Sequence, residues 1–203
     1  MRELADSELV RRALEGEELA YRALVERFQR PVWSLIVRMV KDPSLAEDIA
    51  QEAFLKAFSA LSRFEPEHRF SSWLFKIAHN TALDALRQQK LRQTVSLDSS
   101  EEGETSRAER LEDESAATPE ADAENRDLGR ELEGALAEVR PEYREVIVLR
   151  FQEGLAYEEI AEVMSLPLGT VKTYIHRARK ELAAGMRRRG YRPSGETERG
   201  DSP

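Results

Sequence analysis

The chain contains 203 residues, enough for one large domain or two small ones. Four helix-favouring residue types, Glu (30), Arg (25), Ala (24) and Leu (23), account for 102 of them, so we expect an all-α protein. The absence of cysteine excludes disulfides, iron–sulfur clusters, thiolate metal sites and a cysteine nucleophile. The first residues lack a signal-peptide core and no stretch approaches the roughly 18 apolar residues of a membrane span, so we expect no membrane insertion and a cytoplasmic location.

The formal net charge of -8 is concentrated in the middle of the chain. Residues 93–125 carry 11 acidic and 2 basic side chains, a balance of -9, and include no aromatic residue. Such a segment buries too little apolar surface to fold, so we expect a flexible acidic linker between two small helical domains, residues 1–92 and 126–190, with a polar tail at 191–203. Residues 172–192 carry 8 basic side chains and 1 acidic one, a balance of +7 that suits a nucleic-acid partner.

Helical periodicity divides the first domain into segments expected at 6–28, 31–40, 44–61 and 71–91. Pro31 is expected to begin the second helix, where its missing N–H costs nothing. Ser44 precedes Glu47 by three residues, which predicts a capping box for the third helix. Ser71 is a candidate cap for the fourth helix.

The third predicted helix has a broad apolar stripe that must face a core. The remaining positions Asp48, Gln51, Glu52 and Leu55 follow the spacing i, i+3, i+4 and i+7, so they share one exposed ridge. Solvation alone explains many ridges of this kind. The ridge is therefore either a solvated surface or a docking site for a partner.

The fourth predicted helix places an aromatic side chain beside basic and amide side chains. Leu74, Ile77, Ala78, Thr81 and Ala85 face inward at helical spacing, which leaves Trp73, Lys76, Asn80 and Arg87 on another side. Aromatic rings that stack on bases and cations that follow phosphates are typical of single-stranded DNA recognition. The alternative is that Trp73 is an ordinary core aromatic.

The second domain is expected to contain helices at 128–138, 141–151, 157–164 and 170–186, and the last two resemble a helix-turn-helix. The predicted buried positions of the last helix are Val171, Ile175, Ala178 and Leu182. Its opposite face carries Lys172, Thr173, His176 and Arg177 toward a major groove, with Arg179, Lys180 and the run Arg187-Arg188-Arg189 better placed for phosphates. The alternative is a solvated basic hairpin in an interaction domain.

Four segments together resemble the bacterial extracytoplasmic-function sigma factors of the sigma-70 family, which are small two-domain specificity subunits of RNA polymerase. The segments are LVRRALEGEELAYRALVERF, AEDIAQEAFLKAF, FSSWLFKIAHNTALDALR and LRFQEGLAYEEIAEVMSLPLGTVKTYIHRARKEL. The resemblance implies a sigma region 2 bundle and a helix-turn-helix sigma region 4. It also implies binding to core RNA polymerase, through the largest-subunit clamp helices and the flap, and to promoter DNA, with an anti-sigma factor as a further partner.

The resemblance assigns roles to the residues above. Asp48, Gln51, Glu52 and Leu55 would dock on the polymerase clamp helices. Arg63, His68, Arg69, Trp73, Lys76 and Asn80 would capture the minus-10 element and help to open it, while Lys172, Thr173, His176, Arg177, Arg179 and Lys180 would bind the minus-35 element. Lys76-Ile77 stand where housekeeping sigma factors carry an aromatic pair, which implies weaker melting and tighter promoter choice.

The same resemblance sets a distance that the two domains must span. Promoter elements about 25 base pairs apart, at about 3.4 Å per pair, are separated by about 85 Å of duplex. A flexible coil of the 33 residues 93–125 spans only about 30 Å on average, and at most about 110 Å. The linker is therefore expected to act as an extended spacer.

Rival functions remain from other classes of protein. A stand-alone helix-turn-helix regulator would use the same recognition face but leaves Trp73 and Gln51-Glu52 unexplained, and an adaptor would not need that basic face. An enzyme needs a convergent set of groups, yet His68, His79 and His176 have no metal-ligand spacing and no Gly-rich phosphate loop occurs. We therefore expect no catalytic residue, no metal and no cofactor.

Overall fold

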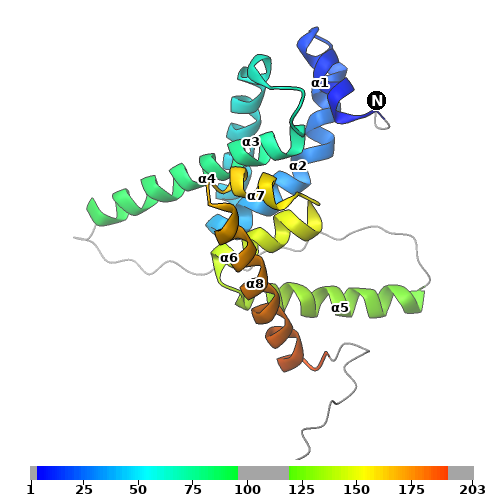
Figure 1. The fold of residues 1–203 in the computed structure, drawn as a ribbon, viewed down its shortest axis with the longest axis vertical. Helices are drawn as coiled ribbons and strands as arrows, with labels where there is room; N and C mark the ends of the chain where they lie inside the picture. The colour runs from blue at the N-terminus through cyan, green and yellow to red at the C-terminus, as the bar shows by residue number, and fades with distance from the viewer. Residues whose placement is uncertain (1–3, 96–118, 192–203) are drawn as a thin grey trace, which may run out of the picture.

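The computed structural model describes residues 4–95 and 119–191, and these residues form helices and connecting turns without a strand (Figure 1). The N-terminal helices are α1 (Asp6–Leu14), α2 (Glu18–Val40), α3 (Pro43–Ser59) and α4 (Phe70–Val95), with a 3-10 turn η1 (Leu61–Arg63). The C-terminal helices are α5 (Pro119–Glu138), α6 (Pro141–Ile147), α7 (Tyr157–Val163) and α8 (Leu168–Arg188), with a π-helical turn η2 (Val148–Gln152). The predicted all-α fold of two helical domains is confirmed.

The N-terminal domain packs α2, α3 and α4 around one core, with α1 against α2. Leu24, Ile36, Leu74 and Phe75 are fully buried at its centre. Helix α1 also buries one face, and Leu9 and other apolar residues on that face belong to the same core. Each helix thus keeps a second face for solvent or partners.

The C-terminal domain packs α8 against α5, α6 and α7. Val171, Ile175 and Ala178 of α8 are buried, as predicted, and Leu182 is partly buried. At Gly185 the helices approach so closely that an added Cβ would lie 3.1 Å from the Cβ of Ala135 on α5. A glycine at this position lets α5 and α8 cross in close contact.

Two predicted helix boundaries in the first domain are wrong. The chain breaks after α1, where Gly16 adopts a left-handed φ of +88°, and Pro31 lies inside α2 rather than at the start of a helix. Phe28 and Val32 on either side of Pro31 are buried. Their burial keeps α2 continuous even though Pro31 cannot donate a backbone hydrogen bond.

The predicted caps are also corrected. Asp42 is the N-cap of α3, and its carboxylate accepts hydrogen bonds from the backbone N–H groups of Ser44 (2.9 Å) and Leu45 (3.1 Å), with Pro43 in the first turn. Ser44 is therefore inside the helix. Ser71 follows the first residue of α4 and is buried, so it does not cap that helix either.

The ends of the predicted linker are helical, since α4 continues to Val95 and α5 begins at Pro119. Residues 119–127 begin with a proline and are rich in Ala and Glu, a combination that favours a helix start. The remaining part of the predicted linker, 96–118, and the tail residues 192–203 lie outside the described residues.

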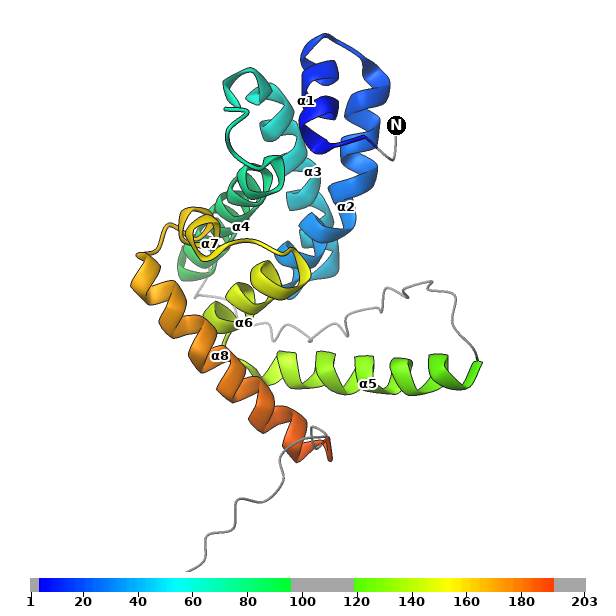
Figure 2. The same ribbon diagram turned by 45° about the vertical axis from the view of Figure 1, so that its right-hand side comes forward.

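The two domains contact each other directly. Helix α7 packs against α4, and α6 packs against α2 (Figure 2). The helix-turn-helix therefore lies beside the helix that carries Trp73 and Lys76.

The cap assignment is tested by two alanine variants of the same segment. Asp42→Ala removes the acceptor of two backbone N–H groups, so it should lower the free energy of unfolding by about 1 kcal/mol. Ser44→Ala should change it by less than about 0.5 kcal/mol, because a surface side chain without a capping role contributes little. Urea unfolding of both variants measures the difference, and a larger loss for Ser44→Ala would show that Ser44 is the cap.

Candidate protein and nucleic-acid interfaces

The predicted ridge on α3 is a single exposed surface. Asp48, Gln51 and Glu52 are exposed, and Leu55 is 69% exposed, the largest fraction for a large hydrophobic residue within 4–95 and 119–191. On the opposite side of the helix Ala46, Ile49, Ala53 and Phe54 are buried. The packing of α3 therefore does not depend on the ridge side chains. Glu52 pairs with Lys56 one turn later (2.7 Å), an exposed pair that a partner's cation can replace.

Trp73 is partly buried. Its ring lies in a cluster with Phe64 (5.4 Å between centroids) and Phe70 (5.8 Å). Trp73 is therefore neither a fully buried core aromatic nor a fully exposed one. Lys76 and Asn80 are exposed on the same helix. The aromatic cluster holds the Trp73 ring beside these polar side chains.

Three predicted site residues before α4, Arg63, His68 and Arg69, are exposed and contact different neighbours. Arg63 ends the turn η1, and His68 lies 3.3 Å from Glu65 in the same loop. Arg69 instead donates to the carbonyl of Gly154 (3.2 Å) and to the carboxylate of Glu159 (3.4 Å) in the C-terminal domain. The structure therefore brings five of the six predicted minus-10 residues to the N-terminal domain's own surface and ties the sixth to the other domain.

The predicted recognition face of α8 is exposed in full. Its members are Lys172, Thr173, His176, Arg177, Arg179 and Lys180. The Thr173 hydroxyl donates to the carbonyl of Gly169 (2.9 Å), one turn earlier. The turn before α8 contains Ser165 in the left-handed region, φ 54°, and ends at Pro167. The backbone conformation of this turn therefore determines how α7 and α8 are oriented in the motif.

Arg177 is held by a residue that the sequence analysis did not name. Its guanidinium donates to the hydroxyl of Tyr143 on α6 (3.0 Å), and Tyr143 packs against Tyr174 and under the Arg140 guanidinium (4.1 Å). Tyr143 is buried, and its hydroxyl has a hydrogen-bond partner in Arg177. A buried tyrosine thus limits where the Arg177 side chain can point.

The arginines at the end of α8 have a structural role. Arg188 donates to Glu138 on α5 (2.5 Å), and Arg189 pairs with Glu138 (2.8 Å) and Glu131 (3.4 Å). These guanidiniums lower the pKa of the Glu138 carboxyl. Arg188 and Arg189, which the sequence analysis assigns to phosphates, here join α8 to α5 through partners that lie 50 or more residues away in the sequence.

The sequence analysis also missed a buried acid–base pair between the domains. The His79 ring on α4 contacts the carboxylate of Glu145 on α6, and both side chains are at least nine-tenths buried. The sequence predicts only that His79 is not part of a metal site. The described residues contain no group of three or more potential metal ligands, and no helix among them is long and apolar enough to cross a membrane.

Comparisons with known proteins identify the family. Residues 24–92 match sigma-70 region 2, and residues 129–182 match sigma-70 region 4. The chain is 37% identical over 181 residues to the RNA polymerase sigma-H factor of Pseudomonas aeruginosa, covering 87% of this chain and 91% of that protein. It is 38% identical over 184 residues to the ECF RNA polymerase sigma-E factor of Escherichia coli strain K12, covering 89% of this chain and 93% of that protein.

Solved structures show the same arrangement of helices. CnrH, in complex with the cytosolic domain of CnrY, superposes with a TM-score of 0.59 at 26% identity, over 89% of this chain and 96% of that one. The sigma factor RpoE of Bartonella quintana, in complex with the anti-sigma factor NepR, superposes with a TM-score of 0.65 at 20% identity, over 82% of this chain and 96% of that one, a likeness of fold. Because both domains match sigma-70 family models and these relatives cover nearly the whole chain, the chain belongs to the extracytoplasmic-function group of RNA polymerase sigma factors, which direct promoter-specific transcription initiation.

Proposed function

We propose that this sigma factor performs its function through three exposed helix faces, each opposite a buried face. The ridge Asp48, Gln51, Glu52 and Leu55 on α3 docks on the clamp helices of core RNA polymerase. Its chemistry supports this, since two carboxylates beside an exposed leucine match a partner that is basic at its rim and apolar at its centre.

The face around Trp73 on α4 binds the minus-10 element as single-stranded DNA. Lys76 and Asn80 supply a cation and an amide beside the Trp73 ring, and Arg63, His68 and Arg69 extend the polar surface into the preceding loop. The Trp73 ring is anchored by Phe64 and Phe70, so it offers a base a fixed partner rather than a free side chain. A fixed ring loses little entropy when a base binds.

The face of α8 reads the minus-35 element, and the exposure of all six of its polar residues is the observation that carries the proposed function. Lys172, Thr173, His176 and Arg177 lie toward the major groove, while Arg179 and Lys180 attract phosphates. A stand-alone regulator would use α8 alone. The acidic ridge on α3 and the sigma relatives favour a polymerase subunit instead.

The chain itself catalyses no reaction in this account, because RNA synthesis belongs to the polymerase that it joins. Residues 1–92 form the docking and minus-10 domain, 93–125 the spacer and 126–190 the minus-35 domain, with a polar tail at 191–203. Core polymerase and promoter DNA are its partners in the cytoplasm. By analogy with the complexes of CnrH and of RpoE, an anti-sigma factor holds it inactive.

The docking assignment predicts that charge reversal on the ridge weakens polymerase binding without unfolding the domain. Asp48→Lys with Glu52→Lys should lower the affinity for core polymerase at least about tenfold, since like charges then face the partner. Fluorescence titration with core enzyme measures the affinity, and circular dichroism checks the helical content.

A matched control uses Glu15→Lys at the C-cap of α1 together with Glu18→Lys at the start of α2. These exposed carboxylates lose the partners Arg11 and Arg22, as Glu52 loses Lys56 in the ridge variant, and the net charge changes equally. Equal losses in both double variants would show that overall charge, not the ridge, determines docking.

The minus-35 assignment predicts different effects along α8. Arg177→Ala should weaken transcription from a preferred promoter about tenfold more than from one mutated in the minus-35 element, because a bidentate contact to guanine contributes roughly 1–3 kcal/mol of discrimination. Lys180→Ala should weaken both promoters alike and reduce the salt dependence by about one phosphate contact. Run-off transcription across a salt series measures both.

A substitution of Tyr143 tests the role of Arg177 on α8 independently. Tyr143→Phe removes the hydroxyl that accepts from Arg177 but keeps the buried ring. It should reduce promoter discrimination several-fold while leaving polymerase affinity unchanged. Undiminished discrimination in Tyr143→Phe, with a full loss in Arg177→Ala, would show that Arg177 reads DNA without this support.

A further inference from the structure

Thr173 presents a methyl group on the exposed face of α8. Its hydroxyl donates to the backbone carbonyl of Gly169 (2.9 Å), so the hydroxyl proton is used within the helix and is not available to a base. The side chain is exposed, and its remaining group is the methyl. In the major groove a threonine methyl group contacts the C5-methyl group of thymine, which no other DNA base carries. Thr173 is therefore suited to an apolar contact with thymine.

Gly169, one turn before Thr173, has no internal reason to be a glycine. It lies in the first turn of α8 with a helical backbone and is exposed. A Cβ added to it would meet no atom within 4 Å among the described residues, its own helix backbone and chain neighbours aside. Alanine favours a helix more than glycine does, whereas glycine is typical of places where a ligand approaches the backbone closely. Because Gly169 and Thr173 share one helix face, the glycine leaves space beside the Thr173 methyl group.

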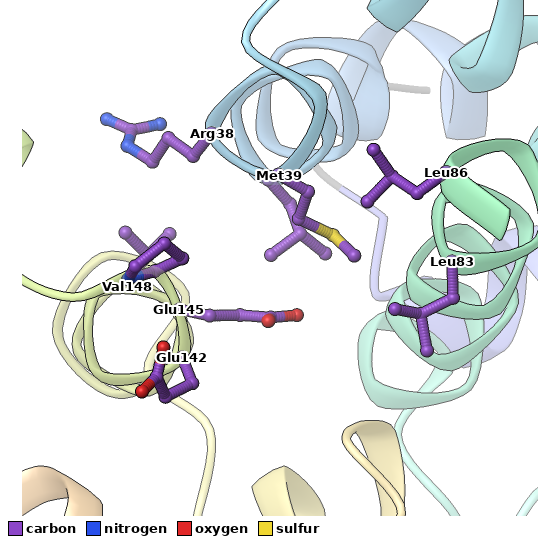
Figure 3. Close-up of a pocket in the computed structure, with 9 residues that line it drawn as sticks. Arg38, Met39, Leu83, Leu86, Glu142, Glu145 and Val148 are labelled. Atoms are coloured by element: carbon purple, nitrogen blue, oxygen red, sulfur yellow. The ribbon is translucent and has the colours of Figure 1, made fainter. Parts of the chain in front are cut away.

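Helix α6 fixes the position of Arg177, the next residue on this face. It packs between α2 and α8. Its Glu145 side chain extends toward a cavity of about 200 Å³ that Met39 on α2 and Leu83 on α4 also line (Figure 3). Its Tyr143 hydroxyl, two residues earlier and so on a different side of the helix, accepts from Arg177 (3.0 Å). Arg177 is thus held by a helix with neighbours on both sides.

The spacing of Thr173 and Arg177 limits where the thymine can lie. Side chains four residues apart on a helix have Cβ atoms about 5–6 Å apart, and successive base pairs are about 3.4 Å apart. The base that Thr173 contacts therefore lies within about two base pairs of the guanine assigned to Arg177.

We propose that Gly169 and Thr173 determine specificity for a thymine in the minus-35 element. Gly169 lets the start of α8 lie close to the base edges, and the Thr173 methyl group packs against the thymine C5-methyl group. This assignment rests on the proposed function, because it requires α8 to enter the major groove of that element. It adds the base, the chemical group and the position relative to the guanine of Arg177.

Deoxyuridine tests this contact directly, because it differs from thymidine only by the missing C5-methyl group. The probe is a promoter duplex whose minus-35 element the holoenzyme enriches from a random library, with each thymidine of that element replaced in turn. Competition binding to the holoenzyme, formed from the full chain and core polymerase, measures the affinity. One replacement, within about two base pairs of the guanine sensed by Arg177→Ala, should weaken binding about fourfold, the effect of one lost methyl contact.

Two variants of Thr173 separate its methyl group from its hydroxyl. Thr173→Ser keeps the hydroxyl and removes the methyl group, so thymidine and deoxyuridine at that position should bind equally well. Thr173→Val keeps the methyl group and removes the hydroxyl, so the fourfold difference should persist. Lys180→Ala, assigned to phosphate, is the control and should weaken binding to both probes alike.

Gly169→Ala separates stability from binding. Urea unfolding should show equal or higher stability, because alanine favours the helix. Binding to the promoter should nevertheless weaken at least about fivefold, because the added methyl group meets the edge of the DNA. Gly129→Ala on α5 is the matched control, since Gly129 is also an exposed helical glycine with open space around an added Cβ. It should leave promoter binding unchanged.

The thymine contact would be overturned by an enriched element without an A·T pair within about two base pairs of that guanine. A deoxyuridine effect that survives in Thr173→Ser or disappears in Thr173→Val would also overturn it, as would unchanged binding of Gly169→Ala. If the holoenzyme enriches no minus-35 element, the proposed function itself fails. If it enriches one that is insensitive to every deoxyuridine, the proposed function stands and the thymine contact fails.

Discussion

The proposed polymerase and minus-35 surfaces depend on two helices, α3 and α8, that bury one face and leave the other exposed. On α3 small and aromatic residues such as Ala46, Ala53 and Phe54 fill the core, so the opposite ridge can be acidic and carry an exposed leucine. On α8 Val171, Ile175 and Ala178 do the same for a basic face. Because the core contacts lie on one side only, partner-binding residues are not needed for folding.

The separation of charge along the chain gives the two domains an attraction for each other as well as for their partners. The acidic first half of the region 4 domain faces Arg69, Ser72 and His79, and its basic second half faces away. An anionic partner such as promoter DNA would compete with the Glu159 carboxylate for Arg69 and would be attracted to the basic second half. Electrostatic complementarity of this kind favours a specific arrangement more than it adds affinity.

Local patterns predicted much of this structure. The ridge on α3 and the buried positions of α8 follow from spacing alone, since residues three and four apart share a helix face. The helix break at Gly16 was missed because the apolar spacing continues across it, and Pro31 was misplaced because burial of Phe28 and Val32 outweighs its lost hydrogen bond. The cap was predicted at Ser44 because Ser44 and Glu47 have the spacing of a capping box, whereas Asp42 forms the cap directly before Pro43.

The contacts that were not predicted join residues distant in sequence. His79 and Glu145, Arg177 and Tyr143, and Arg189 and Glu131 are each more than 30 residues apart, and none leaves a local signal. They depend on how helices pack, which periodicity does not determine. The roles of the polymerase and DNA surfaces came from the family resemblance and not from spacing.

The central claim is that this chain selects promoters by two coupled DNA elements. It is tested most directly by transcription of a randomised promoter library with bacterial core RNA polymerase purified free of sigma factors. Sequencing of the transcripts made with the chain should show two short enriched elements at one fixed spacing, upstream of the start sites. Transcripts that match those of core polymerase alone, or enrichment of a single element without a fixed spacing, would contradict the claim.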